Sequence, residues 1–145
     1  MYDIWKKEAI NALELYEARK RAIVNIPDQI KELEERLTSI RSAASGSITV
    51  KGSGSSKDDT YINNIVAREK LSANLEEAKK HVFRVSSALD VLSNEEKEIL
   101  CRFFVDQERG AADNIAEEKH IDRKTVYYRK DAALKKFAYA MYGGI

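Results

Sequence analysis

The sequence predicts an all-α protein in which a long helical hairpin or coiled-coil region precedes a C-terminal helix-turn-helix. Three observations lead to this fold class. Apolar residues recur at three- and four-residue spacing along most of the 145-residue chain. A glycine- and serine-rich stretch, SGSITVKGSGSS, interrupts that pattern at residues 45–56. The segment Ala111–Phe137 reads as a short helix, a tight turn and a longer cationic helix.

The N-terminal region predicts two helices, each with one apolar face. The first follows a heptad seam that only Arg19 interrupts, and Pro27 can open the second, with Asn25 as a nearby cap. Each apolar face must be buried against a partner. Two antiparallel helices folded at Pro27 would bury only part of these faces. The first seam consists of Trp5, Ala9, Ala12, Tyr16, Arg19, Ile23 and Ile26, and the second of Ile30, Leu33, Leu37, Ile40 and Ala44.

Residues 45–57 predict a flexible linker, because glycine and serine dominate and no seam can be drawn. A short Ile48–Val50 strand would also fit, whereas the glycine spacing of a nucleotide-binding loop is missing. A third long helix is expected to begin near Asp58 or Asp59. Its partner is either the N-terminal hairpin or a second copy of the chain. Its seam consists of Leu71, Leu75, Ala78, Val82, Val85, Leu89 and Leu92.

Ser93 is expected to begin the next helix through a capping box with Glu96. That helix carries Ile99, Leu100, Phe103 and Phe104, which would cover the inner side of the helix-turn-helix. Gly110 supplies backbone freedom in the turn that follows. These features divide the chain into a helical region, residues 1–92, and a DNA-binding domain, residues 93–142.

The helix-turn-helix is expected to present one apolar and one cationic face. Asp122 is a suitable N-cap, whose carboxylate can accept a backbone N–H of the second helix, and Ile121 fills the turn. Residues at helical spacing then separate into two sets. Val126, Ala133, Leu134 and Phe137 form the inner face, and Arg123, Lys124, Tyr127, Tyr128 and Lys135 form the outer face.

Positive charge is concentrated in the same segment. Residues 119–136 hold seven lysines and arginines against two aspartates, and seven minus two gives +5 in a chain whose net charge is +1. Such a concentration suits contact with phosphates, although a solvated helix face would have a similar composition. The cations are Lys119, Arg123, Lys124, Arg129, Lys130, Lys135 and Lys136.

Other classes of site lack support in the sequence. Cys101 lies among apolar residues and is expected to be a buried or half-buried thiol, and His81 is expected to flank the seam of the third helix. One cysteine and two scattered histidines form no metal set, and no acid–base pair is placed by a motif, so we expect no metal, no cofactor and no catalytic activity such as that of a nuclease. No apolar run of about 18 residues is present, so a cytoplasmic protein without a membrane span is expected.

Four segments of the C-terminal half are distinctive: LSNEEKEIL at 92–100, IAE at 115–117, DRKTV at 122–126 and ALKKF at 133–137. Together they resemble sigma-70 region 4. More narrowly, the chain is similar to the phage late-operon transcriptional regulators of the ArpU/RinA type, which also place a helical half and a loose glycine/serine segment before the motif. His120 departs from the glycine common in this turn, and Arg129 from an apolar residue. The MYG at 141–143 is similar to the ending of these phage regulators.

The resemblance implies that the start of the second motif helix reads a promoter element in a bacterial host cell. Arg123, Lys124, Tyr127 and Tyr128 would face bases, and Thr125 and Arg129 would lie closer to phosphates. Sequence-independent affinity would come from Lys119, Lys130, Lys135 and Lys136. The expected partners are double-stranded DNA, RNA polymerase, as in region-4 relatives, and a second copy of the chain. A small terminase-type packaging subunit, which also joins such a motif to a helical oligomerisation region, is the alternative.

Overall fold

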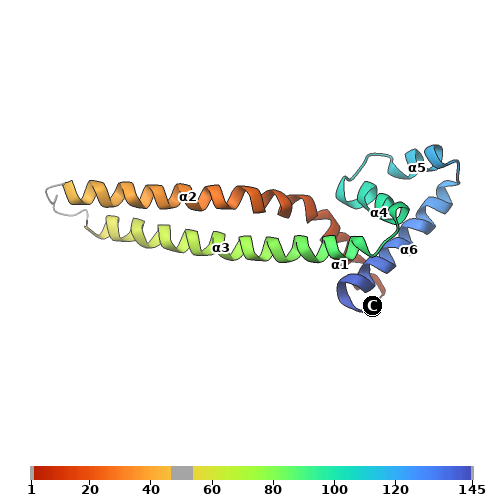
Figure 1. Ribbon diagram of the computed structural model, residues 1–145, viewed down its shortest axis with the longest axis horizontal. Coiled ribbons are helices and arrows are strands. Elements are labelled where there is room, and N and C mark those ends of the chain that lie inside the picture. Colours follow the sequence, from red (N-terminus) through yellow and green to blue (C-terminus); the bar gives the residue numbers. More distant parts are fainter. Residues whose placement is uncertain (1, 47–53, 145) are drawn as a thin grey trace. The chain divides into compact units, whose positions relative to one another are not determined.

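The described part of the protein is entirely helical, as expected. A computed structural model describes residues 2–46 and 54–144, and side chains within 4–39 and 58–144, and no strand occurs among these residues. The α-helices are labelled in Figure 1, and a single-turn π-helix, η1, follows α4. The elements in order are α1 (Tyr2–Glu14), α2 (Tyr16–Gly46), α3 (Gly54–Asp90), α4 (Asn94–Leu100), η1 (Cys101–Val105), α5 (Ala111–Lys119) and α6 (Arg123–Tyr142).

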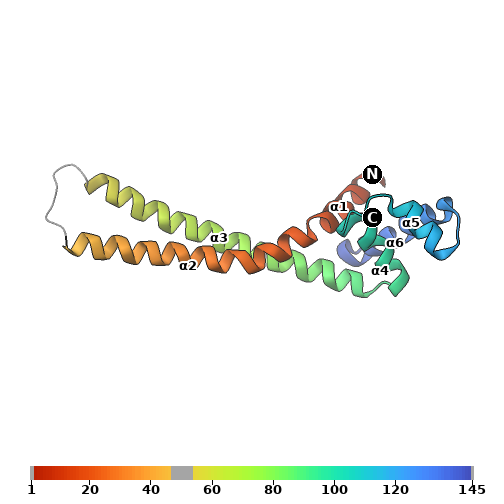
Figure 2. The same cartoon turned by 90° about the horizontal axis from the view of Figure 1, so that it is seen from above.

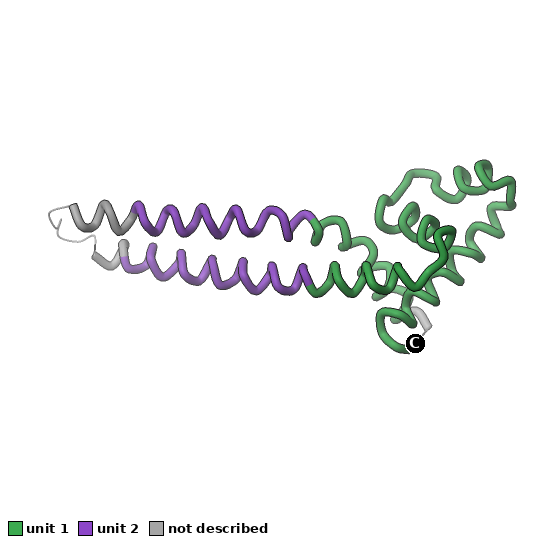
Figure 3. Tube along the Cα trace, viewed as in Figure 1, with its two compact units in different colours: residues 1–20, 80–145 green, residues 21–79 purple. Residues whose placement is uncertain are grey.

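The chain divides into two compact units. Unit 1 contains residues 1–20 and 80–145, and unit 2 contains residues 21–79 (Figure 3). The first helix therefore belongs with the C-terminal unit. A sequence shows which face of a helix is apolar, but not which distant face covers it.

The larger apolar cluster of unit 1 explains why α1 belongs there. Trp5, Ala9 and Leu13 are buried on α1, and α1 packs against α6 and η1. The last part of α3 completes the cluster, so the seam expected for the third helix is buried at its C-terminal end. The other buried members are Ala12, Val85, Ala88, Leu89, Leu92, Leu100, Ala133, Leu134, Phe137 and Ala138.

A second, smaller cluster joins α4, α5 and the start of α6. Ile99, Ala112, Ile115 and Val126 are buried together, and Phe103, Ala116 and Ile121 pack at its edge. The apolar residues of α4 thus cover the inner side of α5 and α6, as the sequence predicts. This cluster fixes which side of α6 remains available to a partner.

The expected capping box at the start of α4 is confirmed. The Ser93 hydroxyl accepts the Glu96 backbone N–H at 3.2 Å, and the Ser93 N–H donates to Glu96 Oε1 at 3.2 Å. Farther along, Cys101 is half-buried, as expected. Burial and, secondarily, the charge of Asp106 raise the pKa of its thiol. The thiol is therefore held in its neutral form.

Unit 2 pairs α2 with α3, which lie side by side and antiparallel in both Figure 1 and Figure 2. The Asn64 side chain is buried between them, where its Nδ2 donates to the Leu33 carbonyl at 2.8 Å. Arg68 Nε donates to Asn64 Oδ1 at 3.0 Å. Both ends of the amide are satisfied, so this residue ties the two helices at one register.

Two sequence expectations for this part of the chain require correction. Pro27 does not open a new helix but lies inside α2. Proline has no backbone N–H, and the hydrogen bond that this costs the helix falls on its exposed side. The helix continues because Ile26 and Leu37, on either side of the proline, are both buried. In addition, α2 extends to Gly46 and α3 begins at Gly54, before Asp58. Residues 47–53, including Ile48–Val50, lie outside the described residues.

Candidate nucleic-acid interface

The candidate interface begins at the turn between α5 and α6. His120 has a left-handed backbone with φ of 54°, and the backbone N–H groups of His120 and Ile121 both point to the Ala116 carbonyl. This arrangement closes the C-terminus of α5 and brings Ile121 onto the smaller cluster, as the sequence predicts. A glycine would adopt this backbone without steric cost, so His120 stores strain here.

Asp122 occupies the N-cap position of α6, but its carboxylate makes no cap hydrogen bond. The expected side-chain cap is therefore wrong. The backbone of Asp122 has the extended conformation of an N-cap, and its carbonyl accepts the Val126 N–H at 3.1 Å. Its exposed carboxylate can remain hydrated, which removes most of the gain from a cap bond.

The two faces of α6 separate as expected. Val126, Ala133, Leu134 and Phe137 are buried. The predicted interface residues differ in accessibility: the turn lysine and the two side chains nearest the inner face are half-buried, and the rest are exposed. Lys119, Thr125 and Lys130 are half-buried, and Arg123, Lys124, Tyr127, Tyr128, Arg129 and Lys135 are exposed.

Arg123 lies at the first residue of α6 and contacts two side chains. Its Nε is 3.4 Å from Asp113 Oδ1 of α5, and its Nη2 donates to the Tyr127 hydroxyl at 3.3 Å. The bond with Tyr127 and, secondarily, the charge of Asp113 raise the pKa of the guanidinium. The side chain nevertheless remains 62% exposed, so it is accessible to a partner.

Lys130 is directed toward aromatic rings of the same unit. Its ammonium lies 4.8 Å from the ring centroid of Tyr127, 5.1 Å from that of Phe103 and 5.9 Å from that of Phe104. The side chain is only 16% exposed. The geometry is that of cation–π contacts, so this cation fastens α6 to η1 as well as adding positive charge.

Two other cations of the segment are paired with glutamates of α4. Lys119 Nζ is 3.4 Å from Glu98 Oε2, and Lys136 Nζ is 3.0 Å from Glu96 Oε2. The hydrogen bond from Lys136 is the main cause of the lowered pKa of Glu96. Part of the positive charge counted in the sequence is therefore balanced within the fold.

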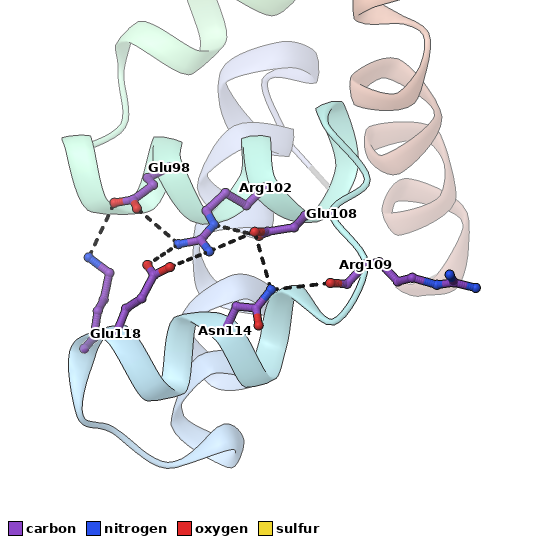
Figure 4. A network of polar contacts seen from close by, with 7 residues as sticks. Glu98, Arg102, Glu108, Arg109, Asn114 and Glu118 are labelled. Carbon is purple, nitrogen blue, oxygen red and sulfur yellow. Dashed lines mark hydrogen bonds and ion pairs between the residues drawn. The ribbon is translucent and has the colours of Figure 1, made fainter.

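Arg102 organises the polar network that holds α5 in place (Figure 4). Its Nε and Nη2 donate to Glu108 at 2.8 and 3.1 Å, and its Nη1 and Nη2 donate to Glu118 at 2.6 and 3.1 Å. Glu98 approaches Nη1 at 3.5 Å. Because Glu118 lies on α5 and Arg102 on η1, these bonds fasten the helix that precedes the turn.

Arg102 changes the pKa values of two glutamates that it contacts. Its hydrogen bonds are the largest cause of the lowered pKa of both Glu108 and Glu118, while the two glutamates raise the pKa of the guanidinium. The Asn114 amide adds longer contacts, 3.5 Å to Glu108 Oε1 and 3.4 Å to the Arg109 carbonyl. The network joins groups on α4, η1, the following turn and α5.

Sequence reasoning missed Asp113, Phe103 and Arg102 as neighbours of the interface. All three lie outside α6, Asp113 on α5 and both Arg102 and Phe103 on η1, so spacing within α6 contains no signal for them. The nearest signal in the sequence is the expectation that Phe103, in the helix after Ser93, covers the inner side of the helix-turn-helix.

Two further classes of site find no candidate among the described residues. No group of three or more His, Cys, Asp or Glu side chains in residues 4–39 and 58–144 could hold a metal ion. Within the same part of the chain, no helix is long and apolar enough to cross a membrane.

Comparison with known proteins identifies a family. No curated protein and no solved structure matches the chain. A family model does match over residues 37–138, which include the C-terminal end of α2, all of α3 and the segment from α4 to Ala138 of α6. The chain therefore belongs to the family described as "Protein of unknown function (DUF1492)".

Proposed function

We propose that the chain is a sequence-specific DNA-binding transcription regulator in which α5, the turn at residues 120–122 and α6 act as a helix-turn-helix. The observation that carries the proposal is the outer surface of the first turns of α6. Arg123, Lys124, Tyr127, Tyr128 and Arg129 are all exposed there, while Val126 behind them is buried. A recognition helix needs this combination, because its N-terminal residues reach base edges while its other side is fixed by the protein.

The side chains on this surface suit both kinds of DNA contact. Arg123 and Lys124 would donate to guanine O6 and N7 in the major groove, and Tyr127 and Tyr128 would contact thymine methyl groups or phosphates. Thr125 and Arg129 would lie nearer the backbone. Lys135, exposed farther along α6, would supply sequence-independent affinity.

The biological setting is supported by the resemblance in the sequence. The segments around Ser93 and Asp122 resemble sigma-70 region 4, and the order of helical half, glycine/serine segment and motif resembles the ArpU/RinA-type regulators. On this basis we assign the chain to control of late phage or prophage genes, such as those for packaging and lysis. No catalytic step is part of the proposal.

Selection of binding sites from random duplex DNA, carried out at two salt concentrations, tests the proposal. We expect an enriched motif and binding that weakens as salt is raised. Arg123→Ala should then reduce affinity for the selected site by roughly tenfold and relax one base preference, whereas Lys135→Ala should weaken all sequences alike. The absence of any enriched motif, or equal sequence-blind losses in both variants, would contradict base reading.

We further propose that unit 2 pairs with a second copy of the chain. None of its described residues belongs to either buried cluster, and Ile62 and Val66 of α3 are 55% exposed. Such a pair of amphipathic helices gains stability by burying its apolar faces against more helices. A groove on the pair is lined by Ile30, Glu34, Ile65, Arg68, Glu69 and Ser72.

The charges of this groove favour a second copy as the occupant. Glu34 lines the groove from α2 and Arg68 lines it from α3, so a two-fold related copy would set each Glu34 against Arg68 of the other copy. Sedimentation of the full chain should show a dimer, which Ile62→Glu with Val66→Glu should dissociate. A monomer at all concentrations would reject this pairing, and a large closed ring would favour the packaging alternative.

A further inference from the structure

Among the described residues, the polar contacts of the Arg123 guanidinium lie along one of its edges, and its Cζ lies 5.7 Å from the centroid of the Tyr127 ring. Its Nε faces Asp113 Oδ1 at 3.4 Å and its Nη2 donates to the Tyr127 hydroxyl at 3.3 Å. Nε and Nη2 bound the same side edge of the planar group. The terminal edge, formed by Nη1 and the second hydrogen of Nη2, is a separate pair of parallel donors.

Tyr127 is itself fixed from the inside of the unit. Its ring lies 6.1 Å from that of Phe103, between centroids, and the Lys130 ammonium lies 4.8 Å from the Tyr127 centroid. Phe103 packs against the smaller buried cluster. The hydroxyl that contacts Arg123 is therefore anchored through these rings to the core, rather than free to follow the arginine.

We propose that Asp113 and Tyr127 are positioning residues for Arg123, and that Asp113 sets base discrimination rather than overall affinity for DNA. The inference rests on the proposed function. With its side edge held by an acid on α5 and a hydroxyl on α6, the guanidinium presents its terminal edge to the partner. Two parallel donors match guanine O6 and N7, which is the commonest base-specific contact of arginine.

The charge of Asp113 makes its positioning role distinguishable from a role in fold stability. The carboxylate is 66% exposed close to the surface that would face phosphates, so it opposes sequence-independent binding. Its removal should therefore strengthen binding to random DNA slightly while weakening the preference for the correct base. A residue that only stabilised the fold would change both affinities in the same direction.

The test compares Asp113→Asn with Glu117→Gln in the full chain. Glu117 is exposed on the same helix, so its substitution removes the same charge, and the structure records no contact between it and Arg123. The measured quantity is the ratio of affinities for the selected duplex and for the same duplex with the base pair read by Arg123 replaced. Affinity for a random duplex and the thermal midpoint are measured in parallel.

Asp113→Asn should reduce the discrimination ratio by about two- to fivefold, the range expected for an exposed ion pair. Affinity for the random duplex should stay constant or rise, as in Glu117→Gln, which should leave the ratio unchanged. Tyr127→Phe keeps the ring and loses the hydroxyl, so it should also lower the ratio. In an Arg123→Ala background, Asp113→Asn should no longer affect the ratio.

Failure of the positioning role can be distinguished from failure of the proposed function. A wild-type protein that discriminates between the duplexes, with a ratio that both Asp113→Asn and Tyr127→Phe leave unchanged, would overturn the positioning role alone. A wild-type protein that binds no duplex at low ionic strength would reject the proposed function and this inference with it.

Discussion

Two arginines that contact α5, Arg102 and Arg123, differ in how many edges of the guanidinium are paired. Arg102 has carboxylates on both edges of its guanidinium, Glu108 along the side and Glu118 at the end, and its side chain is 15% exposed. Arg123 meets an aspartate and a tyrosine along one edge and is 62% exposed. An arginine with both edges occupied holds the fold, whereas one with a free edge can still bind a partner.

The two arginines are connected through α5. The Arg102 network ties η1 and the turn after it to α5, and α5 in turn supplies Asp113 to the start of α6. The position of the exposed arginine therefore depends on the buried one. Substitutions at Arg102 and at the turn, together with titration of the glutamates, test how the two arginines differ.

The largest effect on stability is expected for Arg102→Ala. The variant loses both bidentate contacts and leaves Glu98, Glu108 and Glu118 close together without their shared cation. We expect the thermal midpoint, measured by circular dichroism, to fall by about 5–10 °C. Arg109→Ala is the matched control, because that side chain is exposed and only its carbonyl joins the network (Figure 4). Equal midpoints for the two variants would show that Arg102 does not hold the fold.

A smaller effect is expected from acid. Arg102 lowers the pKa of Glu108 and Glu118 in the folded state below the ordinary value of 4.5. A lowered folded-state pKa stabilises the protein above the unfolded value, and this stability is lost as pH falls below 4.5 through the folded value. Denaturant midpoints measured between about pH 5 and pH 3 should therefore fall less steeply in Arg102→Ala than in the wild type. Parallel slopes would exclude these carboxylates as the cause.

The smallest effect is expected at the turn between the two arginines. His120→Gly removes the steric cost of the left-handed backbone, with φ of 54°, but adds entropy to the unfolded chain. The net gain should be about 0.5–1 kcal/mol, seen as a rise of a few degrees in the thermal midpoint. His120→Ala keeps the Cβ and should give no gain. A lower midpoint for the glycine variant would mean that the imidazole itself stabilises the turn.

Local features of the fold were predictable from the sequence. The Ser93 capping box, the turn at Ile121 and the buried side of α6 all depend on residues within one helical turn or on a single helical period. The same reasoning failed at Pro27, because the burial of neighbouring residues outweighs the missing backbone hydrogen bond. A strong local signal can thus be overridden by packing that it does not encode.

Long-range features of the interface were not predictable. Spacing predicts that Arg123 and Tyr128 lie on the outer face, where they are exposed, but it contains no signal for the aromatic contacts of Lys130. The rings that surround Lys130 come from η1, and Asp113 comes from α5. Which side chains meet across elements depends on how the helices cross, and one sequence does not contain that information.

The most direct test of the central claim is a titration of the full chain with a random-sequence duplex at low ionic strength, repeated as salt is added. The proposed interface predicts binding that weakens as salt rises, with a shallower salt slope for Lys124→Ala with Lys135→Ala than for the wild type. A wild-type chain that binds no duplex at low salt would contradict the account.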